Sequence, residues 1–291
     1  MAAIKRPASS SQKKRNLAYT PHLISYIDIL GFRELIAEKS PNLISRAIRR
    51  VIETTAPDAQ ILKENRENYI NFSDLIVHTV PILSSANKKF REGLVFVEVN
   101  NLALAQAALI EEDLLIRGAL TIGEIERTYG VLFGPGLISA YELEREHAQF
   151  PRIVVDPNVI EALKQMPLLR AHEYSEEMEY ISKFIKRDDD GIIFIDYLGG
   201  MQGEGEPEDY FAFLRVHKEF VEKNLAKFKD KRRVLAKHLW LKKYHNAVVR
   251  ARLTKDFYEE LLVSGTDTAP EVSDLMPRLP IDDEESSDEV S

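Results

Sequence analysis

Hydrophobic and polar positions follow two different periods along the first part of the chain. His22 to Leu30 is an apolar, β-branched run that ends before a glycine, as a buried strand does. From Arg33 to Thr54 the apolar positions have helical spacing, and Pro41 is expected to divide this segment into two helices. Tyr69 to Val80 is again strand-like on both sides of Ser73-Asp74, which predicts a β-hairpin with this pair at its tip.

The pattern then predicts a long helix from about Asn87 to Leu115 and an alternating strand from Ile116 to Glu124. Strand, helix, hairpin, helix and strand in this order form the βαββαβ arrangement of ferredoxin-like and palm domains, in which helices cover one face of an antiparallel sheet. The sequence therefore predicts an α+β fold with this core. The later elements expected are a helix at 137–147, a strand at 152–155, a helix from 157, a strand at 191–198, and helices through 208–262 with a break near 230.

Composition divides the chain into four segments. Residues 1–16 are polar and basic, and residues 265–291 end in a run of acids. Neither has the apolar pattern that would offset the entropy of ordering, so both are expected to be disordered. Residues 17–205 carry the predicted core and are expected to form one compact domain, and residues 206–264 a helical C-terminal arm.

Charge and residue content exclude several classes of catalytic and binding site. The chain has no cysteine, which excludes thiol nucleophiles and cysteine-bound metals, and its seven histidines are scattered without ligand spacing. A net charge of −8 argues against a nucleic-acid-binding face, because phosphate contacts need clustered Lys and Arg. The sequence has neither a membrane-spanning run nor the apolar stretch of a secretory signal. We therefore expect a cytoplasmic protein that is not inserted into a membrane.

Two aspartates in the predicted sheet are the main candidates for catalysis. Asp28 lies near the end of the first strand, and Asp74 lies at the hairpin tip. Adjacent strands would bring these carboxylates close together, where they repel each other unless a cation lies between them. The turn after Asp28 leaves the Ile29 carbonyl free to face the same ion. A pair of Mg²⁺ or Mn²⁺ ions held in this way can bind a nucleoside triphosphate.

Several motifs resemble the catalytic domains of class III adenylate and guanylate cyclases. The family has an Asp-Ile-x-Gly-Phe strand, a Gly-Asp hairpin, a strand that ends in Thr-Gly-Glu, and a helix start with Gly-x-x-Val-Asn-x-Ala-x-Arg-Leu-Glu. The corresponding segments here are Asp28 to Phe32, Phe72 to Asp74, Arg117 to Glu124 and Gly134 to Glu144. The resemblance extends from Ser25 to Leu198.

This resemblance implies a homodimeric cyclase with active sites at the subunit interface. Asp28, Asp74 and the Ile29 carbonyl would hold two Mg²⁺ or Mn²⁺ ions. Further candidates for nucleotide contacts are Phe32, Ser73, Arg117, Gly134 and Arg152. Four of them have simpler interpretations: Ser73 as a cap of the hairpin, Arg117 as a cation on an edge strand, Gly134 as part of an ordinary turn before a helix, and Arg152 as a surface charge.

The departures from the family pattern concern substrate recognition. The Asn and Arg of the family's helix correspond to Ile138 and Glu142, which cannot stabilise phosphate charge. The purine-reading Lys falls at Ile70 or Asn71, and its Asp partner at Val131. The triphosphate-binding Lys of the last strand has no clear match near Asp188 to Asp190, where Lys186 and Arg187 are the only nearby cations. Arg145 and Arg152 are the nearest candidates to replace the missing Arg, and Glu142 and Glu144 are expected on a solvated helix face or in interface ion pairs.

Two interpretations follow from these departures: the chain is an inactive relative kept for binding, or it is a diverged cyclase that recognises another base. Inactive relatives usually lose the metal carboxylates, because an unpaired buried acid destabilises a fold, and both acids are present here. The missing purine readers then favour UTP or CTP. This combination is similar to the pyrimidine cyclases of bacterial antiphage (Pycsar) systems, which implies a cyclic nucleotide read by a cyclic-nucleotide-binding effector. The alternatives are an inactive nucleotide-sensing or dimerisation module and a palm-type oligonucleotide polymerase or two-metal nuclease.

Overall fold

The computed structural model describes residues 17–55, 68–128, 131–203 and 205–265. The two segments expected to be disordered, 1–16 and 265–291, therefore lie outside it except for Gly265. The first strands and helices follow the predicted order: β1 (Thr20–Ile29), α1 (Phe32–Glu38), α2 (Pro41–Thr55), β2 (Asn68–Phe72), β3 (Leu75–Pro81), α4 (Ser85–Phe90), α5 (Leu94–Ile110) and β4 (Ile116–Thr128).

These strands form the predicted ferredoxin-like core. They lie in the order β2-β3-β1-β4 and are antiparallel to one another, so the α+β fold expected from the sequence is confirmed. The hairpin at Ser73-Asp74 and the helix break before Pro41 are also confirmed.

The sheet continues beyond β4 as a mixed sheet. Strand β6 (Ile153–Val155) pairs with β4 in parallel, β8 and β7 follow it, and β5 (Val131–Phe133) pairs with the far end of β4. The remaining elements up to residue 203 are α6 (Pro135–His147), α7 (Pro157–Gln165), η1 (Pro167–Leu169), α8 (Tyr174–Ile181), β7 (Ile185–Arg187), β8 (Ile193–Ile195), α9 (Tyr197–Gly200) and η2 (Met201–Gly203).

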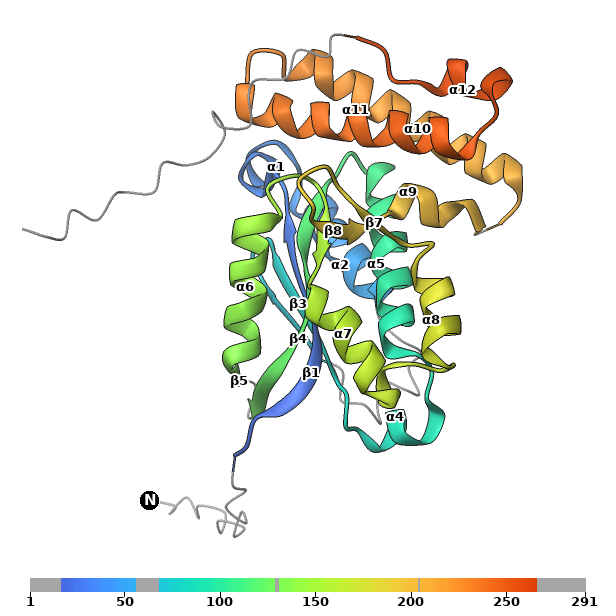
Figure 1. Ribbon diagram of the computed structural model, residues 1–291. Coiled ribbons are helices and arrows are strands. Elements are labelled where there is room, and N and C mark those ends of the chain that lie inside the picture. Colours follow the sequence, from blue (N-terminus) through green and yellow to red (C-terminus); the bar gives the residue numbers. More distant parts are fainter. Residues whose placement is uncertain (1–16, 56–67, 129–130, 204, 266–291) are drawn as a thin grey trace, which may run out of the picture.

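Helices lie on both faces of the sheet, so the expectation that one face alone is covered is wrong. The main core contains Leu23, Ile27 and Ile29 of β1 together with α2 and α5 residues. The alternate residue Ile24 contributes to a smaller cluster with Ala140 of α6 on the other face. Figure 1 shows α6 and α5 on opposite sides of the strands. Because successive strand residues point to opposite faces, Asp28 belongs to the α6 face.

Helix α6 approaches the sheet closely because glycines meet at the contact. A Cβ atom on Gly123 of β4 would lie 2.3 Å from the Cα atom of Gly136 in α6, which is far inside van der Waals contact. These two residues therefore need the absence of a side chain, and the Gly134-Pro135-Gly136 segment at the start of α6 has a packing role.

Several elements differ from those predicted. The long helix from Asn87 to Leu115 is two helices, because Gly93 adopts a left-handed conformation (φ 76°) between α4 and α5, and α5 ends at Ile110. The strand expected at 191–198 covers Ile193–Ile195 alone, and Tyr197 begins a helix capped by Asp196. The short strand β7 was not expected from the sequence.

The C-terminal helices are α10 (Pro207–Lys227), α11 (Arg232–Arg252) and α12 (Lys255–Leu261), with the predicted break between the first two. They lie across the end of the sheet at which β1 leads into α1 (Figure 1). Among the described helices, none combines the length and the apolar character that crossing a membrane requires. The boundary between a domain at 17–205 and an arm at 206–264 stays a prediction.

Candidate active site

Asp28 and Asp74 lie at adjoining positions in neighbouring strands. Asp28 pairs with Leu75, the first residue of β3, and the next residue of β1, Ile29, donates its N–H to the Asp74 carbonyl over 3.1 Å. Burial raises the pKa of the Asp28 carboxyl above its usual value, and the negative charge of Asp74 raises it further, whereas Arg117 opposes this shift. The fold therefore brings the two predicted carboxylates within electrostatic range of each other.

The two-residue loop that carries Asp74 has a defined geometry. Ser73, its first residue, has a positive φ of 61°, as the first central residue of a type II′ hairpin turn requires. The Asn71 side-chain amide donates hydrogen bonds to the carbonyl oxygens of Ser73 (3.3 Å) and Leu75 (3.1 Å). These bonds hold the loop and direct the Asn71 amide toward the hairpin backbone.

Arg117 joins Asp28 to α6. It lies opposite Asp28 in the β1–β4 ladder, and its Nε donates to Asp28 Oδ2 over 2.9 Å. Its Nη2 lies 2.8 Å from Glu144 Oε1, and its Nη1 donates to the Ala148 carbonyl over 3.3 Å. Strand β4 lies between β1 and β6, so the interpretation of Arg117 as an edge-strand cation is wrong. Glu144 is 5% exposed, so its expected place on a solvated helix face is also wrong.

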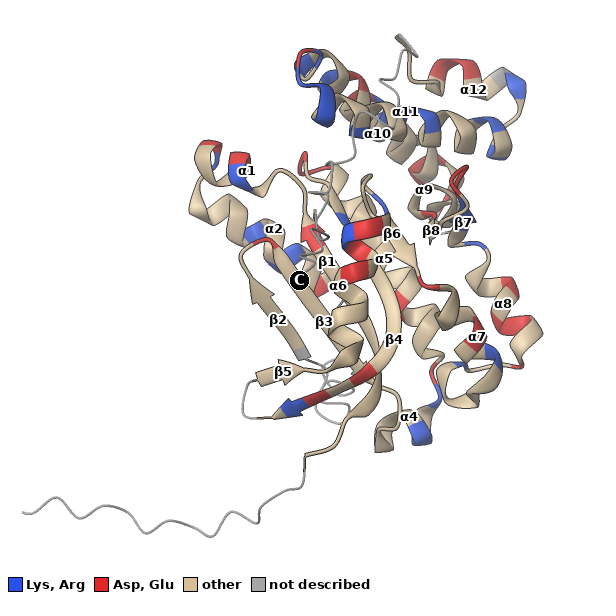
Figure 2. Cartoon of the chain, turned by 60° about the vertical axis from the view of Figure 1, so that its left-hand side comes forward, with Lys and Arg blue, Asp and Glu red and all other residues tan. Residues whose placement is uncertain are grey.

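Glu144 adds a second buried acid to the group. Burial raises the pKa of its carboxyl, the charge of Arg117 opposes this, and the charge of Asp28 adds to it. Asp28 and Glu144 thus both have raised pKa values and share one guanidinium. Such clusters of perturbed acids are typical of functional sites and also occur in structural ion pairs. Figure 2 shows acidic and basic residues together on α6.

Replacing Glu144 by Gln is expected to change how stability depends on pH. A carboxyl whose pKa is higher in the folded chain than in the unfolded chain, where it is near 4.5, binds more protons when folded. Its contribution to the free energy of unfolding therefore falls as the pH rises from about 4.5 through the folded-state pKa. The stability of the wild type relative to Glu144→Gln should decrease over this range.

Urea unfolding of both proteins between about pH 4 and pH 8 measures this difference. Glu142→Gln on the exposed side of the same helix is the matched control and should show no such trend. A wild-type advantage that grows with pH would contradict the assignment of a raised pKa to Glu144.

The residues around Asp28 offer oxygen donors of the kind that Mg²⁺ and Mn²⁺ prefer. Within the described residues, no side chain donates a hydrogen bond to the Ile29 carbonyl oxygen or to Oδ1 of Asp28. Oδ1 of Asp28 and the half-buried Asp74 carboxylate are therefore available to a cation. The described residues contain no group of three or more His, Asp or Glu side chains with metal-binding geometry. Two carboxylates and one carbonyl thus fit divalent ions that also take ligands from a bound triphosphate.

The remaining candidates are not all brought to Asp28. Phe32 begins α1 directly after the β1 turn, and its half-buried ring packs against the main core. Gly134 lies at the N-terminus of α6, whereas Ala148, the Arg117 partner, follows the C-terminus. A helix of this length spans about 20 Å. Within one chain, Gly134 is therefore remote from the carboxylates.

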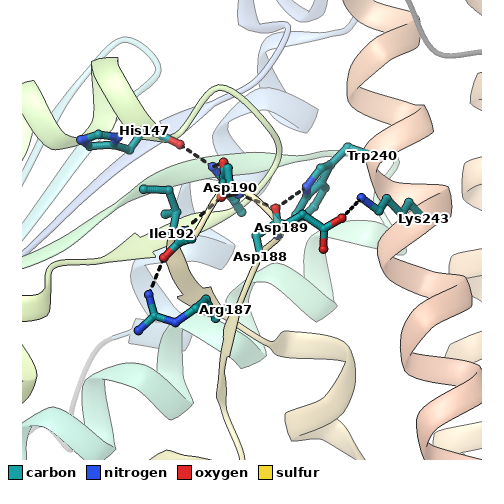
Figure 3. Close-up of polar contacts among 10 residues, drawn as sticks. His147, Arg187, Asp188, Asp189, Asp190, Ile192, Trp240 and Lys243 are labelled. Carbon is teal, nitrogen blue, oxygen red and sulfur yellow. Dashed lines mark hydrogen bonds and ion pairs between the residues drawn. The ribbon is translucent and has the colours of Figure 1, made fainter. Parts of the chain in front are cut away.

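Arg152 is buried in a second charged cluster, whose members Asp188, Asp190 and Trp240 are labelled in Figure 3. Its side chain is 2% exposed and is paired with Asp188 and Asp190 in the turn between β7 and β8. Trp240 Nε1 of α11 donates to Asp188 over 2.7 Å, and Arg152 Nη2 donates to the His147 carbonyl over 3.0 Å. The expectation that Arg152 is a surface charge is wrong. Its two guanidinium nitrogens Nη1 and Nη2 are held by this cluster.

Two charged residues near Asp28 were not expected from the sequence. Glu144 was placed on the helix surface, and Lys237 of α11 lies outside the segment of resemblance, yet its charge interacts with Asp28 and Glu144. The only available signal for Lys237 was its spacing from Trp240 and Tyr244, which puts the three on one helix face.

Comparisons with known proteins find similar solved structures, at low sequence identity and low TM-score. No protein-family model matches the sequence, and no curated protein is significantly similar to it. A bacterial light-regulated adenylyl cyclase has 13% identity and a TM-score of 0.35, covering 51% of this chain and 81% of its own. The guanylyl cyclase Cya2 has 12% identity and a TM-score of 0.35, covering 62% and 93%. The guanylate cyclase domain of RhGC from Catenaria anguillulae, solved with GTP, has 14% identity and a TM-score of 0.32, covering 60% and 94%. At these values the likenesses assign no activity to this chain.

Proposed function

We propose that this chain is a metal-dependent nucleotidyl cyclase that converts a nucleoside triphosphate to the 3′,5′-cyclic nucleotide and diphosphate. The observation that carries the proposal is the meeting of Asp28 and Asp74 at adjoining strand positions, where the Ile29 N–H bonds to the Asp74 carbonyl. Asp28, Asp74 and Ile29 would hold two Mg²⁺ or Mn²⁺ ions. Bound there, the ions would lower the pKa of the attacking hydroxyl and neutralise the leaving diphosphate.

The protein's own groups position this chemistry. Arg117 fixes one oxygen of Asp28 from β4, which leaves the other oxygen directed to a ligand. The substrate's 3′-oxygen forms a bond to the α-phosphorus, the bond from that phosphorus to the β-phosphate oxygen breaks, and the hydroxyl proton leaves to solvent. Holding the triphosphate so that these two bonds are in line is the main task of such a site.

The preferred substrate within this proposal is UTP or CTP. The purine-reading positions of the family hold Ile70 or Asn71 and Val131 here. Ile70 has no polar side-chain group, and the Asn71 amide nitrogen is bonded to the hairpin backbone. A cyclic pyrimidine nucleotide made in the cytoplasm would act as an antiphage signal for a cyclic-nucleotide-binding effector.

Exposed apolar side chains support a homodimer with active sites at the interface. Phe72 at the hairpin is 76% exposed, and Ile138 and Tyr141 of α6 are 61% and 45% exposed. The strand register places Phe72 on the α6 face of the sheet, the face that also presents Asp28. A second subunit that covers these side chains would lie beside the carboxylates.

One observation favours a second candidate, an inactive nucleotide-sensing or dimerisation module. Ile138 and Glu142 are both exposed on α6 at the positions where the family has its Asn and Arg. Neither side chain can stabilise negative charge on a phosphate in transfer. A sensor would bind a nucleotide without forming a product.

The test incubates the full chain with ATP, GTP, UTP or CTP and Mn²⁺ or Mg²⁺, and separates the products by chromatography. A cyclic product, formed best from UTP or CTP, is the expected result. Absence of cyclic product under every condition, including addition of phage-infected lysate, overturns the proposal. Nucleotide binding that survives Asp28→Ala with Asp74→Ala would favour the sensor, and linear or multi-base products would favour the polymerase.

A further inference from the structure

One face of α11 packs against the domain that carries Asp28. Trp240 stacks on Phe150 with ring centroids 5.7 Å apart and donates its indole N–H to Asp188. One turn later, the Tyr244 hydroxyl donates to Asp196 over 2.6 Å. These contacts fix the rotation of α11 relative to the sheet.

Lys237 lies on this same face, one turn before Trp240. Positions three and seven residues apart share a helix face, so Lys237, Trp240 and Tyr244 are aligned toward the domain. The Lys237 side chain is half-buried. Its ammonium group is therefore held at the domain surface by the same packing that orders Trp240.

The surroundings of Lys237 are those of the candidate active site. Burial lowers the pKa of its ammonium group, the charge of Arg117 lowers it further, and the charges of Asp28, Glu34 and Glu144 raise it. These residues come from β4, β1, α1 and α6, so Lys237 faces the point at which four elements meet. Figure 1 shows α11 over the end of the sheet near α1.

Lys237 has no fixed partner there. In the described part of the chain, no hydrogen bond or ion pair engages its ammonium group. Other lysines of the C-terminal helices do have partners: Lys218 donates to the Glu260 carbonyl over 2.7 Å, Lys223 pairs with Asp113 over 2.6 Å, and Lys243 pairs with Asp189. A half-buried ammonium is costly unless something compensates it, so an anion that binds at this point would explain its position.

The other cations considered for binding the phosphates of the substrate have partners elsewhere in the chain. The Arg145 guanidinium, one of the two expected replacements for the missing Arg, is exposed and pairs with Glu146 over 3.1 Å. The Lys186 ammonium lies over the Tyr244 ring, 5.8 Å from its centroid, and Arg187 donates to the Gly191 carbonyl over 2.6 Å. Arg152 is held by two aspartates.

We propose that Lys237 is a phosphate-binding residue of the candidate active site, supplied by the C-terminal helices to contact the triphosphate of the substrate. This inference rests on the proposed function for its substrate class. It gives α11 a direct part in the site, and it places a cation opposite the carboxylates, so that a metal-bound triphosphate would lie between charges of both signs.

The test uses inorganic tripolyphosphate with Mn²⁺ as the probe and measures its binding to the full chain by calorimetry. Lys237→Met keeps the aliphatic stem and removes the charge, and it should weaken binding by at least about tenfold. Lys237→Arg should restore most of the affinity. Lys243→Met makes the same change two turns away on α11 and should bind as the wild type does. Thermal unfolding of each variant verifies folding.

The outcomes separate this inference from the proposed function. Wild-type affinity in a folded Lys237→Met variant overturns the inference, and so does an equal loss in Lys243→Met, which would indicate a general charge effect. Wild-type protein that binds no tripolyphosphate also overturns it. The proposed function is judged by the cyclic product formed by the same preparation. If the wild type forms product and Lys237→Met keeps the wild-type affinity for tripolyphosphate, the inference fails and the proposed function stands. If tripolyphosphate binding depends on Lys237 but no product forms, the chain has a polyphosphate site without cyclase activity.

Discussion

Asp28→Asn is expected to abolish formation of the cyclic product, with a loss of roughly a thousandfold or more in turnover. The amide keeps the shape of the side chain, and its oxygen can still accept the hydrogen bond from Arg117, which in the wild type joins Nε and Oδ2 over 2.9 Å. What the variant loses is the negative charge that holds a divalent cation. Asp74→Asn should have the same effect, because the two carboxylates act on the same ions.

Chromatography of products from UTP and CTP measures this loss, with thermal unfolding to verify that each variant is folded. Asp113→Asn is the matched control: it removes one acid at an exposed position, and Asn tolerates the positive φ of 60° there. This control should retain full turnover. Retained turnover in either Asp28→Asn or Asp74→Asn would remove the basis of the proposed function.

Arg152→Met is expected to lower the free energy of unfolding by about 2–4 kcal/mol. The guanidinium is 2% exposed and binds Asp188, Asp190 and the His147 carbonyl, so its loss leaves two acids close together without their cation. Burial would raise the pKa of Asp190, but the bonds from Arg152 and the Ile192 N–H outweigh burial and lower it. Asp190 therefore stabilises the fold above its unfolded-state pKa near 3.8, and this contribution disappears as the pH falls below that value.

Urea unfolding at about pH 7 and again below about pH 4 measures both effects, and the difference between wild type and variant should narrow in acid. Lys243→Met is the control, because it removes an exposed pair in the same cluster and should change stability by less than about 1 kcal/mol. Adding Asp188→Asn and Asp190→Asn to Arg152→Met should recover part of the loss. Wild-type stability in Arg152→Met would show that the cluster has no stabilising role.

The parts of the fold that were predicted correctly have local causes. Pro41 cannot continue a helix, so it separates α1 from α2. Ser73-Asp74 lies between two strand-like runs, so it forms the hairpin. The errors occur where distant contacts decide the structure. Strand β7 has three residues and exists because it pairs with β8, and such short segments have no period of their own.

The two aspartates of the candidate site could be predicted from the sequence, whereas Glu144 and Lys237 could not. Asp28 and Asp74 could be matched because their segments have a recognisable order along the chain. Glu144 lies four and eight positions after the buried Ala140 and Gly136, so its spacing is that of the buried face of α6, and its charge was what suggested a surface position; Arg117 of β4 pairs with it there. Lys237 reaches the site through the packing of α11, 209 positions after Asp28 by their residue numbers (237 − 28). No local sequence pattern predicts the proximity of Lys237 to Asp28, because it depends on how α11 packs against the rest of the fold.

The two-residue loop at Ser73-Asp74 also limits how this protein can vary. Strand residues alternate between the faces, and Phe72 pairs directly with Leu75. One residue inserted or deleted here would shift the pairing of β2 with β3 or displace Asp74 from Ile29. A redesign of substrate choice should therefore change side chains at fixed loop length, and domain fusions or sensor insertions belong at other turns, such as the exposed turn at 229–231 between α10 and α11.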